Sequence, residues 1–352
     1  MIQNSCIDGK AVLVTGGTGS FGRRFVRTLV ERFQPKRVIV FSRDELKQSE
    51  MATELSPDRY PALRYFLGDI RDRDRLEMAL QSVDVVVHAA ALKQVPAAEY
   101  NPFECIHTNV LGAENIVRAA IRTGVARVIA LSTDKAVNPI NLYGASKLAA
   151  DKIFVAANNL SGASGTRFSV VRYGNVLGSR GSVIPLFLKL IKESAPSLPI
   201  TDPEMTRFWI TLQRSVDFVL SSAAAMKGGE IFVPKIYSMK IVDMAGALAP
   251  HLPQSVVGIR PGEKLHESLI TKDDARNTVE LPECFMILPS IKFWSDNGLS
   301  TLPRMHSNFS YTSDNNSKIL HAADLLRLLK EDGLLSDSST PVQLQVASHV
   351  VR

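Results

Sequence analysis

Short runs of Val, Ile and Leu alternate with longer amphipathic stretches through the first half of the chain. The apolar runs lie at residues 11–15, 37–42, 63–67, 83–88, 127–132 and 167–173. The stretches with helical spacing lie at residues 21–33, 44–55, 72–80, 104–123 and 143–159. Near-continuous apolar strands are typical of sheets that helices cover on both faces. The alternation therefore predicts an α/β fold with a Rossmann-like, doubly wound parallel sheet.

The alternation ends after residue 173, where prolines and short mixed elements take over. We expect residues 1–177 to form the cofactor-binding domain and residues 178–290 to form a smaller α/β substrate domain, with the chain crossing back to the sheet later. Residues 291–352 are expected to be a C-terminal extension. Its Ser-rich tail, from about residue 336, is expected to be flexible.

Charge and composition narrow the classes of function. The 352 residues include 41 Lys and Arg against 35 Asp and Glu, a formal net charge of +6. The basic residues are scattered, which argues against a nucleic-acid partner and suits an anionic small molecule. The three cysteines show neither a CxxC pair nor a metal-binding spacing. The histidines are not paired in a way that would indicate a metal site. The chain has no signal-peptide pattern and no apolar run long enough for a membrane span, so we expect a cytoplasmic protein without a membrane partner.

A glycine-rich turn follows the first apolar run and opens the first amphipathic stretch. Gly16, Gly19 and Gly22 form GxxGxxG, and Thr18, Ser20 and Phe21 lie between them. Glycines allow a tight turn and close backbone approach to a pyrophosphate, to which a helix N-terminus donates free N–H groups. In a strand–turn–helix context, this pattern predicts a dinucleotide site.

The end of the second strand bears on the choice between NAD and NADP. NAD sites tend to place an acid there for the ribose 2′-hydroxyl, whereas Ser42 and Arg43 here precede Asp44. The planar guanidinium of Arg43 can pair with a 2′-phosphate, so we predict NADP. The alternative is that Arg43 is a solvated loop residue. The ends of the third and fourth strands are expected to flank the adenine, ribose or nicotinamide through Asp69, Ile70, Ala89, Ala91 and the following Lys93.

A second motif, YxxxK, lies on the predicted helix 143–159. Tyr143 and Lys147 are four residues apart and so share one helical face, and Thr133 ends the preceding strand. A nearby ammonium and the nicotinamide charge would favour the phenolate, which could take a hydroxyl proton while hydride leaves the same carbon. Thr133 could hydrogen-bond the same oxygen. These residues predict a hydride-transferring enzyme.

Residues 132–147, STDKAVNPINLYGASK, resemble one subgroup of the extended short-chain dehydrogenases. This subgroup is the inverting UDP-N-acetylglucosamine 4,6-dehydratases, which start pseudaminic acid synthesis. Retaining sugar dehydratases have Thr-Asp-Glu where this chain has Thr133-Asp134-Lys135. Similar stretches are FSRDELKQSE at 41–50, YGNVLGSRGS at 173–182, MTRFWIT at 205–211 and RPGEKLHE at 260–267, so the resemblance spans about residues 8–290.

The resemblance implies further binding residues. On the cofactor side it adds Glu45, Leu46 and Lys47. On the substrate side it implies that Lys93 lies near the sugar and that Asn175, Arg207 and Arg260 hold the nucleotide half. The backbone that follows the nucleotide would include Ser179, Arg180, Gly181, Ser182, Val183 and Phe187. For any single arginine the alternative is a surface salt bridge.

Asp134 and Lys135 supply the second acid–base pair that a dehydratase needs. Oxidation at C4 makes a ketone that acidifies the hydrogen on C5, so a base can remove it while an acid protonates the departing C6 hydroxyl. The alkene then accepts the stored hydride at C6 and a proton at C5, which regenerates NADP. We assign Lys135 as the C5 base, with a pKa expected to be depressed, and Asp134 as the C6 acid, with a pKa expected to be raised. The alternative is a structural ion pair at the end of the strand.

The sequence therefore predicts a UDP-N-acetylglucosamine 4,6-dehydratase that inverts C5, with tightly bound NADP and no metal. We expect a homo-oligomer, a dimer or a hexamer, as in the resembled family. A nucleotide-sugar 4-epimerase is the alternative enzyme. A non-catalytic NADP-sensing protein is the alternative from another class, although such a protein would be expected to lack Tyr143 and Lys147.

Overall fold

The computed structural model describes residues 6–162, 165–179, 181–290 and 301–335. Within these residues, nine strands form the main sheet in the order β14-β15-β10-β6-β5-β4-β1-β2-β3. The seven strands from β10 to β3 are parallel, and β15 and β14 are antiparallel additions at one edge. Their bounds are β1 (Ala11–Thr15), β2 (Arg37–Ser42), β3 (Leu63–Leu67), β4 (Val85–His88), β5 (Arg127–Thr133), β6 (Arg167–Tyr173), β10 (Ile231–Pro234), β14 (Thr278–Glu280) and β15 (Cys284–Ile287). The predicted doubly wound sheet is confirmed.

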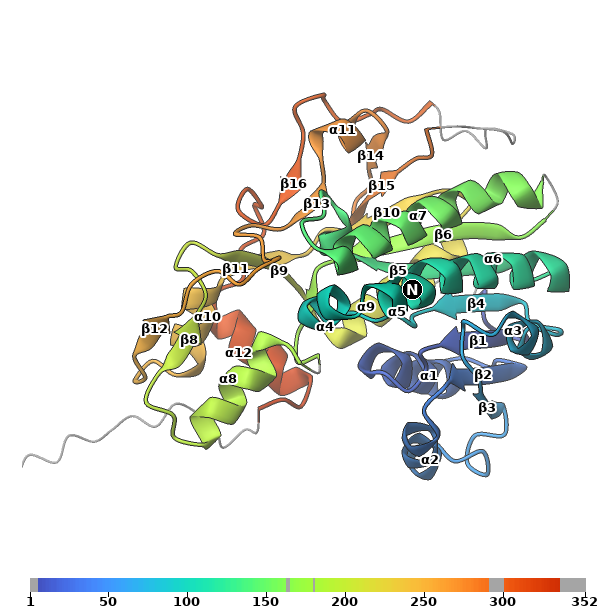
Figure 1. Ribbon diagram of the computed structural model, residues 1–352, viewed down its shortest axis with the longest axis horizontal. Helices are drawn as coiled ribbons and strands as arrows, with labels where there is room; N and C mark the ends of the chain where they lie inside the picture. The colour runs from blue at the N-terminus through green and yellow to red at the C-terminus, as the bar shows by residue number, and fades with distance from the viewer. Residues whose placement is uncertain (1–5, 163–164, 180, 291–300, 336–352) are drawn as a thin grey trace, which may run out of the picture.

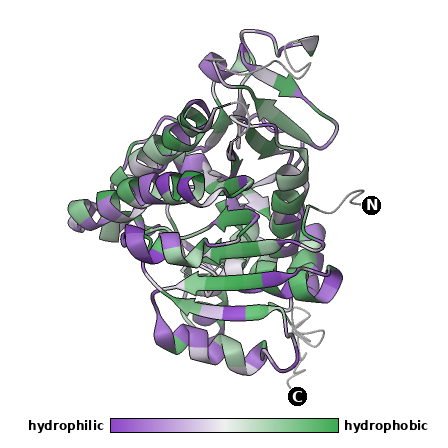
Figure 2. Cartoon of the chain, turned by 90° about the vertical axis from the view of Figure 1, so that its right-hand side faces the viewer, coloured by the Kyte–Doolittle hydropathy of each residue, from purple (hydrophilic) through white to green (hydrophobic). Residues whose placement is uncertain are grey.

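Helices cover both faces of this sheet (Figure 1). On one face lie α1 (Ser20–Arg32), α2 (Glu45–Glu54) and α9 (Leu212–Ala225), where α1 packs on α9. On the other lie α3 (Arg73–Ala79), α6 (Gly112–Thr123) and α7 (Leu142–Ser161), where α6 packs on both α3 and α7. Figure 2 shows the strands between these helices coloured as mostly hydrophobic, as expected when both faces are covered.

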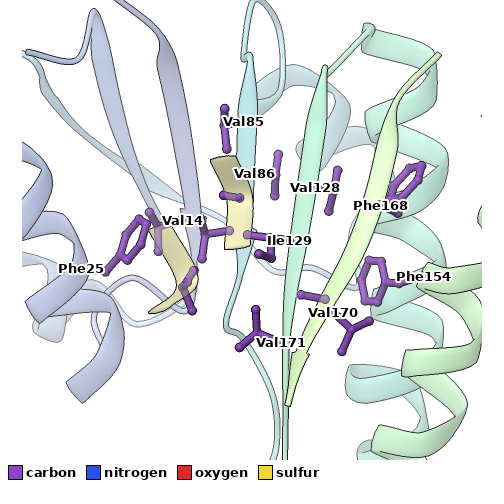
Figure 3. Packing of buried hydrophobic residues seen from close by; sticks show 14 of the residues in the cluster. Val14, Phe25, Val85, Val86, Val128, Ile129, Phe154, Phe168, Val170 and Val171 are labelled. Atoms are coloured by element: carbon purple, nitrogen blue, oxygen red, sulfur yellow. The ribbon is translucent and has the colours of Figure 1, made fainter. Parts of the chain in front are cut away.

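The core follows from this arrangement. Phe25 of α1 and Phe154 of α7 point toward the sheet from opposite sides of the view in Figure 3, and both are fully buried. Phe154 lies beside Phe168 and His88, with ring centroids 6.4 and 5.5 Å away. Between the helices, the β-branched side chains of the central strands fill the interior.

The prediction of one helix over residues 104–123 is wrong in detail. The structure has α5 (Pro102–Ile106), a π-helical turn at His107–Leu111 and then α6. In the π turn, Asn109 forms two 2.8 Å hydrogen bonds with the backbone of Leu92, one to its carbonyl and one from its N–H. A further helix, α4 (Val95–Tyr100), was not predicted. Prolines at the first turn of α4 and α5 fit both starts, because that position needs no N–H donor.

A second, smaller core lies beside the sheet. It is built from α8 (Val183–Lys192), α10 (Ile241–Leu248) and α12 (Ala322–Glu331), with β8 (Leu198–Ile200), β9 (Thr206–Ile210) and β11 (Tyr237–Lys240). Outside this core, β7 (Asn175–Val176) pairs with β9, and the exposed β12 (Gln254–Val256) pairs with β8. Figure 1 shows the three helices gathered to one side of the sheet. Residues after 300 therefore contribute to this core through α12.

A small two-stranded sheet adds Leu269, Ile270 and Tyr311 to the main core. β13 (Ser268–Ile270) pairs antiparallel with β16 (Tyr311–Thr312), and α11 (Lys272–Ala275) follows β13. The chain then returns to the main sheet through β14 and β15. The division of the chain into domains with boundaries after residues 177 and 290 stays a prediction. The tail from residue 336, which was expected to be flexible, lies outside the described residues.

Candidate active site

A cleft of about 600 Å3 lies at the carboxyl ends of the parallel strands. This edge is where open α/β sheets bind ligands. The loops after β1, β2, β3, β4 and β5 all contribute to its walls. The predicted cofactor residues that line it are Gly16, Thr18, Gly19, Ser20, Phe21, Gly22, Ser42, Arg43, Asp44, Lys47, Asp69, Ile70, Ala89, Ala91, Lys93, Tyr143 and Lys147, while Glu45 and Leu46 do not.

The glycine turn has the geometry that a dinucleotide phosphate requires. Gly16 has a φ of 64°, and a Cβ there would lie 2.8 Å from the backbone nitrogen of Ala90. A Cβ on Gly22 would lie 2.5 Å from the Cα of Gly17. Helix α1 begins after Gly19 without a side-chain cap, so its first N–H groups stay available to an anion. These residues fit a pyrophosphate.

The turn after β2 presents the guanidinium of Arg43 to the cleft. The Ser42 hydroxyl lies 3.0 Å from that of Thr18 and accepts the Asp44 N–H at 3.2 Å. Asp44 caps helix α2 by accepting the Lys47 N–H at 3.0 Å, and hydrogen bonds from Lys47 lower the pKa of the Asp44 carboxyl. Arg43 is 54% exposed and lies 3.6 Å from the Asp69 carboxylate. The acid is thus held in a helix cap, whereas the guanidinium projects beside the cleft.

The side chains of Tyr143 and Thr133 both line the cleft and form a hydrogen bond with each other. Burial raises the pKa of Tyr143 to about 12, although the Lys135 charge and a hydrogen bond with Thr133 act in the opposite direction. The predicted lowering of this pKa is thus not found in the chain by itself. Lys147 lies on the same face of α7 and donates to the Leu131 carbonyl at 2.7 Å. Burial lowers the Lys147 pKa, and Asp151 opposes this shift.

Asp134 and Lys135 form an ion pair in the 3-10 turn that ends β5. Asp134 Oδ1 accepts from the Thr133 hydroxyl at 2.8 Å and from Lys135 Nζ at 3.1 Å. Asp134 is fully buried, and its Oδ2 has no hydrogen-bond partner in the part of the chain that the structure describes. Lys135 lines the cleft and also donates to Asn175 Oδ1 at 3.3 Å.

The charge state of Lys135 differs from the prediction. Burial would lower its pKa, but the carboxylates of Asp134 and Glu267 outweigh burial and raise it above the ordinary value. The predicted depression of the Lys135 pKa is therefore wrong for the chain by itself. Glu267, 3.3 Å from Lys135 Nζ, is a site residue that sequence reasoning missed. Its position within RPGEKLHE was the available signal.

The predicted substrate residues separate into two groups. Lys93, Asn175 and Ser179 line the cleft, and burial lowers the pKa of Lys93. The other predicted residues that the structure describes lie outside its walls. Gly181, Ser182 and Val183 lead into α8, Phe187 is buried in the second core, Arg207 is buried on backbone carbonyls, Arg260 is exposed beside Glu263, and Arg180 lies outside the described residues.

Two further observations concern metals and membranes. Within the described residues, no group of three or more His, Cys, Asp or Glu side chains is placed to hold a metal ion. Across the same residues, no helix has the length and apolar character that crossing a membrane requires.

Comparison with known proteins places this geometry in a family. A family model described as polysaccharide biosynthesis protein matches residues 12–289. The inverting UDP-N-acetylglucosamine 4,6-dehydratase of Campylobacter jejuni is 55% identical over 327 residues, which cover 91% of this chain and 97% of the relative. The UDP-glucose 4-epimerase of Rickettsia canadensis is 43% identical over 285 residues, 79% of this chain and 82% of the relative.

Solved structures share the fold. Pen from Bacillus thuringiensis aligns with a TM-score of 0.86 and 36% identity, covering 94% of this chain and all (100%) of that one. The dTDP-glucose 4,6-dehydratase DesIV from Streptomyces venezuelae, with NAD bound, aligns with a TM-score of 0.67 and 26% identity, covering 80% of this chain and 93% of that one. Since the family model matches most of the chain and the Campylobacter relative aligns along nearly all of it, the chain belongs to the polysaccharide biosynthesis protein family of extended short-chain dehydrogenases/reductases.

Proposed function

We propose that this protein is a UDP-N-acetylglucosamine 4,6-dehydratase that inverts C5. The observation that carries the proposal is that Lys135 and Tyr143 both line the cleft, and that the buried carboxylate of Asp134 lies 3.1 Å from Lys135 Nζ. The scheme needs one proton-transfer pair for C4 and another for C5 and C6, and this site offers both. The name and extent of the Campylobacter relative support the same assignment.

The cofactor of the proposal is NADP. The fit of Gly16, Gly19 and Gly22 supports a dinucleotide, and the projecting Arg43 supports a 2′-phosphate. NAD in the related DesIV supports a nicotinamide in general. When bound, the nicotinamide supplies hydride exchange with the sugar at C4 and C6. Tyr143 and Lys147 would hold the ribose and the reacting hydroxyl. The small side chains of Ala89 and Ala91 would let the protein backbone lie close to the cofactor.

The chain's own residues then move the protons. Tyr143, assisted by Thr133, takes the proton of the C4 hydroxyl. Lys135, once neutral, removes the C5 proton, and Asp134, once protonated, gives its proton to the departing C6 hydroxyl so that water leaves. A proton returned to C5 on the opposite face gives the inverted 4-keto-6-deoxy product. We place this product on a pseudaminic acid route to surface glycan or flagellin.

Binding of the substrate is part of the same proposal. Lys93, Asn175 and Ser179 line the cleft beyond Tyr143 and would contact the sugar. Arg260 would serve the uridine diphosphate, as guanidinium groups suit phosphate oxygens. Arg207 would have to release the carbonyls of Thr206, Lys264 and Leu265 before it could do the same. We further propose that the enzyme is cytoplasmic and self-associates as a dimer or hexamer.

A 4-epimerase is the second candidate, because a 4-epimerase is 43% identical to this chain. Epimerisation exchanges hydride at C4 alone and removes no proton from C5. It therefore leaves Asp134 and Lys135 without a task, and their presence in the site favours dehydration.

One incubation separates the two candidates. The purified protein with UDP-N-acetylglucosamine should give a product that has lost one water, detected by mass spectrometry, with C5 inverted by NMR. Asp134→Asn and Lys135→Ala should abolish water loss while the cofactor stays bound, and the exposed Asp324→Asn is the matched control. A product of unchanged mass with C4 inverted would replace this proposal with epimerisation.

A further inference from the structure

A buried carboxylate that the proposed reaction leaves without a role lies behind Lys135. Glu267 directly precedes β13 and is 2% exposed. Its carboxylate lies 3.3 Å from Lys135 Nζ, 3.7 Å from Lys264 Nζ and 4.0 Å from Arg207 Nε. Its Oε2 has no hydrogen-bond partner among the described residues. Burying a carboxylate costs free energy unless cations pair with it, so the three neighbouring cations stabilise Glu267 at this buried position.

Glu267 completes a set of three oxygens around the Lys135 ammonium. The other two are Asp134 Oδ1 at 3.1 Å and Asn175 Oδ1 at 3.3 Å. An ammonium has three N–H donors and accepts none, so three surrounding oxygens fix both its position and its charged form. The three oxygens come from the turn after β5, from β7 and from the residue before β13, so the nitrogen is held from three separate segments.

The C-terminal segment anchors Glu267 in turn. The Ser313 N–H donates to the Glu267 carbonyl at 2.8 Å, and the Glu267 N–H donates to the Ser313 hydroxyl at 2.9 Å. The Ser313 hydroxyl also lies 2.6 Å from that of Thr206, the neighbour of Arg207. Ser313 is 2% exposed and lies beyond residues 12–289, which the family model matches.

We propose that Glu267 is a positioning residue for Lys135 and that Ser313, from the C-terminal segment, fixes Glu267 in place. The proposal rests on the proposed function for the task of Lys135. The C-terminal segment thereby becomes part of the site, although no residue of it lines the cleft in the described chain. Glu267 acts through Lys135 and does not itself contact the cleft.

The charges around Lys135 set the direction of the effect. The charged and titratable groups that face it are Asp134 on its own turn, Tyr143 on α7, Glu267 before β13, Arg207 on β9 and Lys264 in the preceding loop. Glu267→Gln keeps the size of the side chain but removes one of the two carboxylates. The remaining cations, Arg207 and Lys264, then favour loss of the Lys135 proton, so its pKa should fall.

The experiment measures the amine directly, without requiring turnover. The full-length protein is labelled with acetic anhydride across a pH series, and mass spectrometry of the Lys135 peptide gives the fraction of neutral amine. Glu267→Gln should raise Lys135 labelling about tenfold or more at a given pH, which corresponds to a midpoint at least about one pH unit lower. Glu267→Asp keeps the charge and should retain the wild-type midpoint more closely than Glu267→Gln.

The matched control is Glu230→Gln. Glu230 is another buried glutamate, bonded to Ser169 and to the N–H groups of Lys227 and Gly228. Its change should leave Lys135 labelling at the wild-type level. Ser313→Ala should shift labelling in the same direction as Glu267→Gln but less, and should add little in the double variant, because both act through one path.

Unchanged Lys135 labelling in Glu267→Gln, with a folded protein by circular dichroism, would overturn the proposal. If the midpoint of Lys135 labelling shifts in the double variant by the sum of the two single shifts, the proposed role of Ser313 in fixing Glu267 would be overturned. If Glu267→Gln does not fold, the Ser313→Ala variant is decisive by itself, and unchanged Lys135 labelling in that variant would overturn the proposal. If wild-type protein releases no water from UDP-N-acetylglucosamine but the labelling shifts as expected, the proposed function fails while the positioning role stands.

Discussion

Replacing Arg43 with Ala should reduce the preference for NADP over NAD. The guanidinium projects from the turn after β2 and is 54% exposed, with the Asp69 carboxylate 3.6 Å away. A hydrogen bond to a charged group contributes roughly 1.5–3 kcal/mol, and solvent screening at this exposure favours the lower end. We therefore expect NADP to bind roughly tenfold more weakly in Arg43→Ala, while NAD binding changes little.

The local geometry makes this a specific perturbation. Asp69 stays paired in the variant, because Arg71 donates to its carboxylate at 2.8 Å. Asp44 remains the cap of α2, so the turn keeps its backbone bonds. The effect should therefore arise from the missing guanidinium and not from a rearranged turn.

Dissociation constants for both cofactors can be measured by calorimetry on protein freed of bound cofactor. Arg71→Ala is the matched control, since Arg71 also pairs with Asp69 but does not line the cleft. An unchanged ratio of the two dissociation constants in Arg43→Ala would refute the assignment of Arg43 to the 2′-phosphate. It would leave the alternative that Arg43 is a solvated loop residue.

Three further predictions test the reaction, the core and the dependence of stability on pH. Tyr143→Phe should abolish the first hydride step, so a burst of NADPH absorbance at the wild-type rate would contradict its role. Phe154→Ala should lower the free energy of unfolding by about 3–5 kcal/mol in urea titrations, because the ring is fully buried against His88 and Phe168; a loss below about 1 kcal/mol would contradict this packing. Burial lowers the pKa of His88 to about 3, below its ordinary value of about 6.5, so the unfolded chain binds a proton between these values and the folded chain does not. Stability should thus fall by about 1.4 kcal/mol per pH unit as the pH drops through this window, and a variant such as His88→Gln should flatten that slope in urea titrations at several pH values.

The sequence was sufficient for the six strands up to β6 and for most of the cofactor side of the cleft, but not for β10, β14 and β15, which join the sheet from residues 231–287. Strands such as Val85–His88 are buried on both faces, so their composition alone identified them. The glycine turn was predictable because Gly16 must adopt a positive φ against the backbone of Ala90. Both signals are local: each depends on neighbours within one strand–turn–helix unit.

The rest of the site depends on contacts between distant segments. Lys135 and Glu267 are 132 positions apart along the chain (267 − 135), and nothing in either segment alone indicates that they form an ion pair. The same holds for Ser313 and Thr206, whose hydroxyls lie 2.6 Å apart. The pKa of Lys135 was predicted in the wrong direction because burial was given more weight than the adjacent Asp134 carboxylate, and because the second carboxylate, Glu267, was not foreseen.

The resting state of the pair also indicates how the two proposed roles become possible. As an ion pair, Asp134 cannot donate a proton and Lys135 cannot accept one, so neither group can act in its assigned role. A single proton transfer from Lys135 Nζ to Asp134 Oδ1, which are 3.1 Å apart, would produce a neutral amine and a carboxylic acid at once. Burial favours the neutral form of Lys135, whereas the Asp134 and Glu267 carboxylates favour the ammonium. The balance between these two effects is therefore the quantity that Glu267→Gln should change, and labelling of Lys135 should report the change before any substrate is added.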